Sequence, residues 1–112
     1  MIGIYKIANK QNGKVYIGQS IDVERRIKQH KDPKTWFKNP SMLIYKAIRD
    51  YGIENFIFEI IEVCEARDLD EREVFWIKTF NSKRPNGYNI QDGGSSGSNW
   101  KKSIKTNNKM LF

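Results

Sequence analysis

Two short β-branched runs at the start of the chain restrict its fold more than any other sequence feature. Residues 2–7 and 14–18 are rich in Ile, Val and Tyr, and the segment between them contains Asn12–Gly13, the strongest short-range signal for a β-hairpin turn. Side chains alternate between the two faces of a strand, so a loop with an even number of residues places Tyr5 and Tyr16 on the same face. A bulge in the turn would separate them. The sequence therefore predicts an N-terminal hairpin with both tyrosines on one face.

Helical periodicity predicts three helices after the hairpin, over residues 23–30, 41–50 and about 66–80. In the second of them, Ser41 is expected to cap the start and Gly52 to stop the end. The segment 31–40 carries two prolines and is predicted to be a loop.

One further strand completes the predicted sheet. Residues 55–63 form a near-continuous apolar run, which is typical of a strand at the centre of a sheet that is covered on both faces. A short extended piece is predicted at 87–90, after a Pro-Asn-Gly turn. The expected fold class is therefore α/β, with a small, three-stranded, mostly antiparallel sheet flanked by about three helices.

Length and charge limit the classes of protein. A chain of 112 residues and 13.2 kDa corresponds to one small domain with a short tail. The single cysteine excludes an intramolecular disulfide framework and a cysteine zinc site, and it fits a reducing compartment. No apolar run is long enough to span a membrane or to form a signal peptide. The net charge of +7 fits a polyanionic partner, although many small basic proteins carry such charge only for solubility.

The composition changes near residue 92. A Gly/Ser-rich stretch follows, and the remainder contains lysines but no acidic residue. We therefore expect a folded domain over 1–92 and a flexible linker with a basic tail over 93–112. The tail lysines Lys101, Lys102 and Lys105 are expected to contact DNA phosphates without reading sequence.

An acidic residue interrupts the apolar face of the third predicted helix. Leu69, Trp76, Ile77 and Phe80 form the expected buried stripe, and Glu73 lies inside it. A lone carboxylate facing a core is costly unless it is paired or bound to a cation. Three explanations remain open at this point: an ion pair with a buried Arg or Lys, a ligand for a hard divalent metal, or a wrong helix phase.

The first predicted helix is similarly ambiguous. Its many basic residues are usually a solvated face. However, His30 is the only histidine of the chain, and it lies at the edge of the apolar stripe, four residues after Arg26. A histidine in that position is more often a satisfied, half-buried residue than a catalytic one. Alternatively, an arginine and a polar ring on one surface could bind a phosphate and orient an oxygen.

Two tripeptides carry a family resemblance. Residues 3–5 read Gly-Ile-Tyr and residues 16–18 read Tyr-Ile-Gly, with ten residues between the two tyrosines. Together with the helices that contain Arg26 and Glu73 and the segment 87–90, they resemble the GIY-YIG endonuclease family over residues 1–92. Through residues 73–78 and 81–82, the chain is most similar to the catalytic domains of phage and intron-encoded homing endonucleases.

The resemblance implies a role for each of five residues. It implies that Tyr16 is the general base for the attacking water and that Tyr5 positions that water or the phosphate. It also implies that Arg26 stabilises the transition state and that His30 contacts the scissile phosphate. Glu73 would hold one divalent cation, Mg²⁺ or Mn²⁺, at each active site.

Supporting roles are expected for four more positions. The resemblance implies that Asn89 supports the site, and Gly18 is expected to let the phosphate backbone approach closely. Tyrosine has an unperturbed pKa near 10, so it is a poor base unless cations lower the pKa, and Lys14 is one candidate for this effect. Relatives can carry a histidine where this chain has Asn39, which can donate a hydrogen bond but cannot take a proton near neutral pH.

The predicted function is a metal-dependent DNA endonuclease with one active site per chain. Arg25 and Lys28 are expected to contact DNA beside the site. We expect a monomer in the cytoplasm of a prokaryotic or phage-infected cell, with no membrane association. The alternatives are a catalytically decayed family member that still binds DNA, and a repair-type nicking nuclease.

Overall fold

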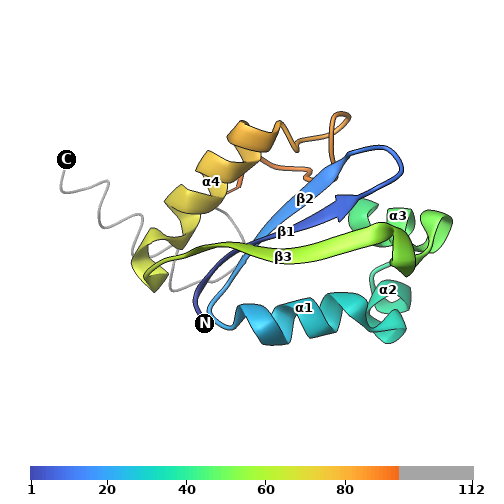
Figure 1. Ribbon diagram of the computed structural model, residues 1–112, viewed down its shortest axis with the longest axis horizontal. Helices are drawn as coiled ribbons and strands as arrows, with labels where there is room; N and C mark the ends of the chain where they lie inside the picture. The colour runs from blue at the N-terminus through green and yellow to red at the C-terminus, as the bar shows by residue number, and fades with distance from the viewer. Residues whose placement is uncertain (94–112) are drawn as a thin grey trace.

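The computed structural model describes residues 1–93, which fold around a three-stranded sheet (Figure 1). The strands are β1 (Gly3–Asn9), β2 (Val15–Ser20) and β3 (Phe56–Val63), and their order across the sheet is β2-β1-β3. Both pairings are antiparallel. The predicted α/β class and three-stranded sheet are confirmed.

The hairpin has the predicted register. Tyr5 pairs with Gly18, and Tyr16 pairs with Ile7. The backbone of Asn9 donates to the carbonyl of Lys14 at 2.9 Å and closes a loop of residues 10–13, so the loop has an even number of residues. Tyr5 and Tyr16 therefore project from the same face, as predicted, with ring centroids 6.4 Å apart.

The predicted central position of the third strand is wrong. The strand β3 lies at an edge of the sheet, and several of its apolar side chains are exposed, including Ile57 (47%) and Val63 (63%). The central strand is β1, because β2 pairs with one of its edges and β3 with the other. A continuous apolar run does not distinguish these positions, since strand order is set by distant pairing partners rather than by local sequence.

Within residues 1–93, four α-helices surround the sheet, one more than predicted. The helix α1 (Val23–Lys31) begins where the Asp22 carboxylate accepts a hydrogen bond from the backbone of Arg25 at 3.2 Å. The predicted loop that follows contains α2 (Pro33–Lys38). Asp32 caps α2, and a proline fits the first helical turn, where a backbone N–H has no partner within the helix. The loop prediction is therefore wrong.

The last two helices agree better with the predictions. The helix α3 (Leu43–Tyr51) ends at Gly52, which adopts a φ of 90°. It begins after Met42 without a side-chain cap, so the predicted cap at Ser41 is wrong. The short 3-10 turn Ile53–Asn55 leads into β3. A second 3-10 turn, Ala66–Asp68, precedes α4 (Leu69–Phe80).

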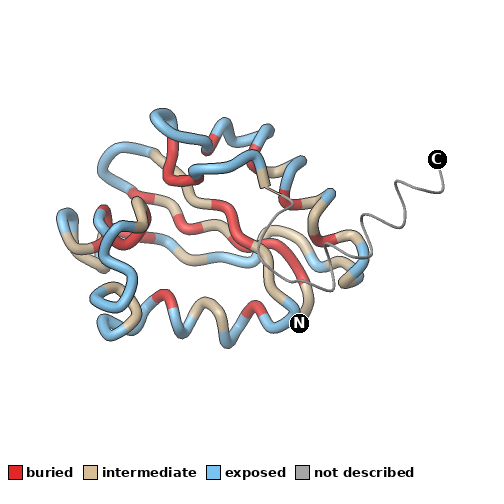
Figure 2. The backbone as a smooth tube through the Cα atoms, turned by 180° about the vertical axis from the view of Figure 1, so that it is seen from behind, coloured by how far each residue is buried: buried red, intermediate tan, exposed pale blue. Residues whose placement is uncertain are grey.

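The sheet separates two apolar clusters. Helix α4 packs on one face, where Ile4 and Ile17 meet Leu69 and Ile77. Helices α1 and α3 cover the other face, around the fully buried Ile7 and its neighbours (Figures 1 and 2). No helix within residues 1–93 is long and apolar enough to cross a membrane.

The buried stripe of α4 is narrower than predicted. Leu69, Glu73 and Ile77 are buried, whereas Trp76 is only partly buried and Phe80 is exposed. The helix phase was therefore correct around Glu73. The predicted linker and basic tail, with Lys101, Lys102 and Lys105, lie outside the described residues except for Gly93, so that boundary stays a prediction.

Candidate active site

The two tyrosines of the hairpin lie in a cluster of polar rings. The hydroxyl of Tyr5 is 2.7 Å from Nε2 of His30, and the hydroxyl of Tyr45 is 2.8 Å from Nδ1 of the same ring. The Tyr16 ring lies 5.9 Å from the His30 ring, centroid to centroid. The strands β1 and β2 and the helices α1 and α3 each contribute one of these four side chains.

His30 is buried more deeply than predicted. Its relative exposure is 0%, and both of its ring nitrogens contact tyrosine hydroxyls. Burial, together with the nearby positive charge of Arg26, lowers the pKa of His30 to about 3. The ring is therefore neutral at physiological pH, and its expected contact with the scissile phosphate stays a prediction.

Arg26 lies on α1 one turn before His30. Its Nη1 donates to Oε1 of Gln29 at 3.0 Å, and its charge acts on the hydroxyls of Tyr5, Tyr16 and Tyr45. The structure therefore brings Arg26 together with the two tyrosines of the family motif. A guanidinium can only donate hydrogen bonds, so it can serve both phenolic and phosphate oxygens.

The close approach at Gly18 involves Tyr5. A Cβ atom placed on Gly18 would lie 2.3 Å from both Cζ and the hydroxyl oxygen of Tyr5. The Tyr5 ring thus occupies the space that a side chain at position 18 would need. The structure gives Gly18 a role in seating this ring, and the expected approach of a phosphate to Gly18 stays a prediction.

Tyr16 is held in its protonated form by its surroundings. Burial and the negative charge of Glu73 raise the pKa of Tyr16 to about 12, against the opposing effect of Arg26. Lys14 lines a second cavity of about 320 Å³ together with Lys46 and Arg84, and its predicted influence on Tyr16 stays a prediction.

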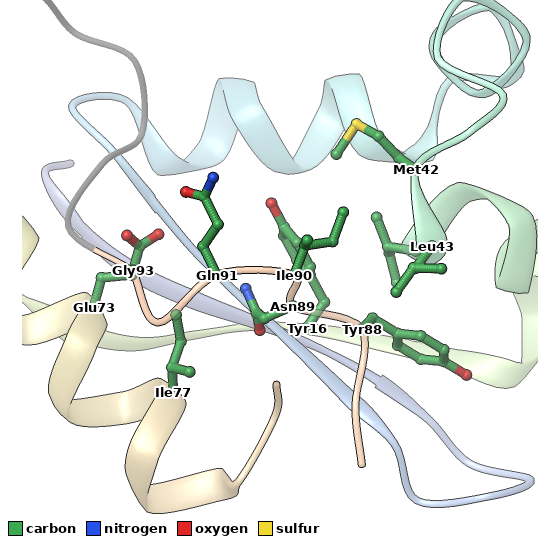
Figure 3. A pocket seen from close by; sticks show the side chains of 11 residues that line it. Tyr16, Met42, Leu43, Glu73, Ile77, Tyr88, Asn89, Ile90, Gln91 and Gly93 are labelled. Atoms are coloured by element: carbon green, nitrogen blue, oxygen red, sulfur yellow. The ribbon is translucent and has the colours of Figure 1, made fainter. Parts of the chain in front are cut away.

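Glu73 and Tyr16 meet at the free edge of β2, although they approach from opposite faces of the sheet. Both line one cavity of about 230 Å³. Figure 3 shows the Glu73 carboxylate and the Tyr16 hydroxyl directed into the same space, with Gln91 between them in this view. Glu73 is the only acidic residue among the described residues that line this cavity.

Gln19 holds the Glu73 carboxylate. Its amide nitrogen donates to Oε1 of Glu73 at 3.0 Å and to Oδ1 of Asp70 at 2.8 Å. Sequence reasoning missed Gln19 and Asp70. Asp70 lies three residues before Glu73 on α4, which placed it on the same helix face, but no local pattern pointed to Gln19.

Asn89 joins the segment after α4 to the edge of β2. Its Oδ1 accepts from the backbone of Ile17 at 2.9 Å and from Oγ of Ser82 at 2.7 Å, and its Nδ2 donates to the Ile17 carbonyl at 2.9 Å. These bonds lie directly beside Tyr16 in the chain. Asn89 therefore fixes the wall of the cavity, with its amide held by these three hydrogen bonds.

The remaining predicted residues lie on the surface. Asn39 ends α2, and its side chain donates to the Thr35 carbonyl at 2.9 Å. Arg25 and Lys28 are both exposed on α1. The structure therefore does not place them among the buried groups of the site.

Sequence reasoning also missed Tyr45, which lies on the apolar side of the cluster of polar rings. It is 1% exposed and packs between α3 and the sheet. Its position three residues before the buried Ile48 indicated an inward direction. The residues that it meets in α1 and β1 could not be identified from helical spacing alone.

Comparisons with known proteins agree with the motif. The GIY-YIG catalytic domain family matches residues 1–89. "Intron-associated endonuclease 1" of Enterobacteria phage T4 is 42% identical over 97 residues, which cover 80% of this chain and 37% of that protein. This chain spans only 32% to 39% of the length of the curated relatives that it matches.

Solved structures show the same fold. The catalytic domain of the homing endonuclease I-TevI superimposes with a TM-score of 0.68 at 38% identity, covering 81% of this chain and 99% of that domain. A mutant of that domain gives a TM-score of 0.69 at 38% identity, covering 82% and 95%. The motif, the fold and the match over residues 1–89 lead to one conclusion: the chain belongs to the GIY-YIG family.

Proposed function

We propose that this chain hydrolyses DNA phosphodiester bonds in a metal-dependent reaction, as the nuclease domain of a homing-type endonuclease. The observation that carries the proposal is the meeting of Tyr16 and Glu73 in one cavity, with the charge of Arg26 acting on Tyr16. Hydrolysis requires a base for the attacking water and positive charge for the phosphoryl oxygens. These residues offer both within one site.

Tyr16 is the proposed general base, and Arg26 is the proposed stabiliser of the transition state. The raised pKa of Tyr16 means that the phenolate forms only when positive charge accumulates nearby. Arg26 already opposes the effects that raise this pKa, and its planar fork can engage two phosphate oxygens at once. Tyr5 would then hold the water or the phosphate, with its ring seated against Gly18.

Glu73 is the proposed ligand of one divalent cation, Mg²⁺ or Mn²⁺. Its carboxylate is oriented by Gln19 and faces the cavity, and a single carboxylate suits a hard cation that keeps most of its water ligands. Within residues 1–93 there is no cluster of three or more His, Cys, Asp or Glu side chains that could hold a metal by itself. The cation would supply positive charge beside Tyr16 and the leaving 3′ oxygen.

DNA is the proposed substrate and partner. The net charge of +7 favours a polyanion, and the T4 relative is named an intron-associated endonuclease. Arg25 and Lys28 on α1, and the tail lysines, are proposed to contact phosphates. With one active site per chain, double-strand cutting would need two sequential nicks or two copies acting together. We propose a monomer that acts in the cytoplasm of a prokaryotic or phage-infected cell.

A plasmid-nicking assay tests the proposal. Supercoiled DNA should be converted to the nicked form with Mg²⁺ and should remain intact with EDTA. Tyr16→Phe should lower the cleavage rate about 10²–10⁴-fold, the usual contribution of a general base. A matched control is Tyr51→Phe, which removes an exposed tyrosine hydroxyl from α3. Equal nicking by the Tyr16 variant would refute the assignment of the base, and metal-independent nicking would refute the cofactor.

A further inference from the structure

Tyr45 is a buried tyrosine that the proposed reaction does not use. Its ring packs in the cluster that contains Ile44, Ala47 and Ile48, and its hydroxyl lies 2.8 Å from Nδ1 of His30. A buried phenolic hydroxyl needs a polar partner, and His30 provides one. The hydroxyl of Tyr45 therefore contributes a specific contact in addition to the packing of its ring.

His30 links Tyr45 to Tyr5. One ring nitrogen faces each tyrosine, at 2.8 Å and 2.7 Å. A neutral imidazole carries one N–H and one acceptor nitrogen. His30 must therefore accept a hydrogen bond from one tyrosine and donate to the other, so the direction of one bond determines the direction of the second.

The neighbours of the two tyrosines decide this direction. Arg26 can only donate, and its positive charge acts on the hydroxyls of both Tyr5 and Tyr45. This charge favours an orientation in which the lone pairs of each tyrosine oxygen face Arg26 and the hydroxyl proton points elsewhere. Tyr5 has Tyr16 beside it on the same face of the sheet, with ring centroids 6.4 Å apart, and can direct its proton to the Tyr16 oxygen, whereas the Tyr45 hydroxyl faces Nδ1 of His30.

We infer that Tyr45 is a positioning residue: it donates to Nδ1 of His30, holds the ring as the Nε2–H tautomer and thereby leaves the proton of Tyr5 directed at Tyr16. Nε2–H of His30 then donates to the Tyr5 oxygen, and every hydrogen bond in the chain points towards Tyr16. This inference rests on the proposed role of Tyr16 as the base.

The direction of these bonds matters for a base. A phenolate oxygen accepts hydrogen bonds strongly, and charge-assisted bonds are about twice as strong as neutral ones. With the Nε2–H tautomer, Tyr5 stabilises the charged form of Tyr16. With the opposite tautomer, Tyr5 would donate to His30, and the Tyr16 oxygen would lose this donor.

Nitrogen NMR of the imidazole tests the tautomer directly. The chain has a single histidine, so the full-length, untagged protein labelled with ¹⁵N-histidine gives one pair of ring signals. Couplings to the two ring protons identify each nitrogen. We expect a protonated Nε2 and an unprotonated Nδ1 throughout pH 5 to 8. A protonated Nδ1 in the wild type would overturn the inference, whether or not the protein cuts DNA.

The Tyr45→Phe variant tests the consequence for catalysis. It keeps the ring and removes only the donor. We expect kcat for nicking to fall about 10–100-fold, the range for losing an outer partner that orients a functional imidazole, with KM for DNA unchanged. The ¹⁵N signals should show that the Nε2–H tautomer is no longer the single form.

Two controls separate positioning from folding. Tyr51→Phe removes an exposed hydroxyl from the same helix, and Ile48→Val lowers stability in the same apolar cluster without removing a polar group. Both control variants should retain the wild-type kcat, even if the Tm of Ile48→Val is as low as that of Tyr45→Phe. Wild-type kcat in Tyr45→Phe, or an equal loss in Ile48→Val, would overturn the inference. If the wild type itself does not nick DNA, the proposed function fails, and the wild-type NMR result still decides the tautomer.

Discussion

Replacing Glu73 with glutamine separates the two roles that a buried carboxylate can have. The change keeps the shape of the side chain, and its amide oxygen can still accept from Gln19, which lies 3.0 Å from Oε1 in the wild type. Only the negative charge is lost. A metal site and a structural ion pair respond to this loss in opposite ways.

As a metal ligand, Glu73 contributes to catalysis at a cost in stability. The side chain is only 7% exposed, and Asp70 lies three residues before it and contacts the same Gln19 amide. Neutralising Glu73 relieves a like-charge contact of about 0.2–0.5 kcal/mol and part of the desolvation of a buried charge. The free energy of unfolding of Glu73→Gln should therefore hold or rise by about 1 kcal/mol, or ~4–8 °C in Tm.

As half of a structural ion pair, Glu73 would give the opposite result. Removing it would leave a buried cation uncompensated and lower the free energy of unfolding by roughly 3–5 kcal/mol. The difference between the two outcomes is several times larger than the error of a thermal or urea unfolding measurement. Stability alone therefore distinguishes the two roles.

The assay combines a thermal melt with plasmid nicking and a DNA-binding titration. Glu73→Gln should lose Mg²⁺-dependent nicking, bind DNA as the wild type does and melt at the same temperature or higher. The matched control is Asp70→Asn. It removes one negative charge from the same helix, its amide oxygen can still accept from Gln19, and it should retain nicking. An early melt, or continued cutting with Mg²⁺, would remove Glu73 from the proposed metal site.

Three other predictions follow from the same contacts. Arg26→Lys keeps the charge but not the planar fork, so nicking should fall about 10²–10³-fold with DNA binding retained, and near-wild-type nicking would indicate simple charge attraction. Gly18→Ala should displace the Tyr5 ring, which lies 2.3 Å from the new Cβ position, and lower the free energy of unfolding by about 1–3 kcal/mol in urea titrations; an unchanged midpoint would refute this packing role. The pKa of His30 is about 3 in the folded state, below its unfolded value of about 6.5. The free energy of unfolding should therefore be highest above pH ~6.5 and should fall by about 1.4 kcal/mol per pH unit from there towards pH 3. A His30→Gln variant measured by urea unfolding at the same pH values should lack this part of the slope, and equal slopes would contradict it.

Local signals predicted the parts of the fold that depend on local geometry. The Asn12–Gly13 turn fixed the hairpin register, and hence the common face of Tyr5 and Tyr16. Gly52 ended α3 as predicted, because a φ of 90° favours glycine. The position of Glu73 on the buried face of α4 also followed from helical spacing.

Features that depend on distant partners were not predictable in this way. The edge position of β3 depends on which strand pairs with each side of β1. The contacts of Tyr45 with His30 and of Gln19 with Glu73 join residues 15 and 54 positions apart. Periodicity identifies the face of an element that is buried, but it contains no information about the side chain that meets it there.

The pKa of Tyr16 allows base activation and transition-state stabilisation to be measured separately. Glu73 raises this pKa and Arg26 lowers it. Glu73→Gln should therefore lower the pKa of Tyr16, yet we expect it to abolish nicking, because a more acidic phenol does not replace the positive charge that the reaction needs. Arg26→Lys keeps a positive charge on α1, so the pKa of Tyr16 should change little. The nicking rate should nevertheless fall strongly. Ultraviolet titration measures the pKa of Tyr16 in each variant. If the nicking rates instead followed this pKa, deprotonation of the phenol would limit the reaction. The charge-stabilising roles assigned to Arg26 and Glu73 would then be wrong.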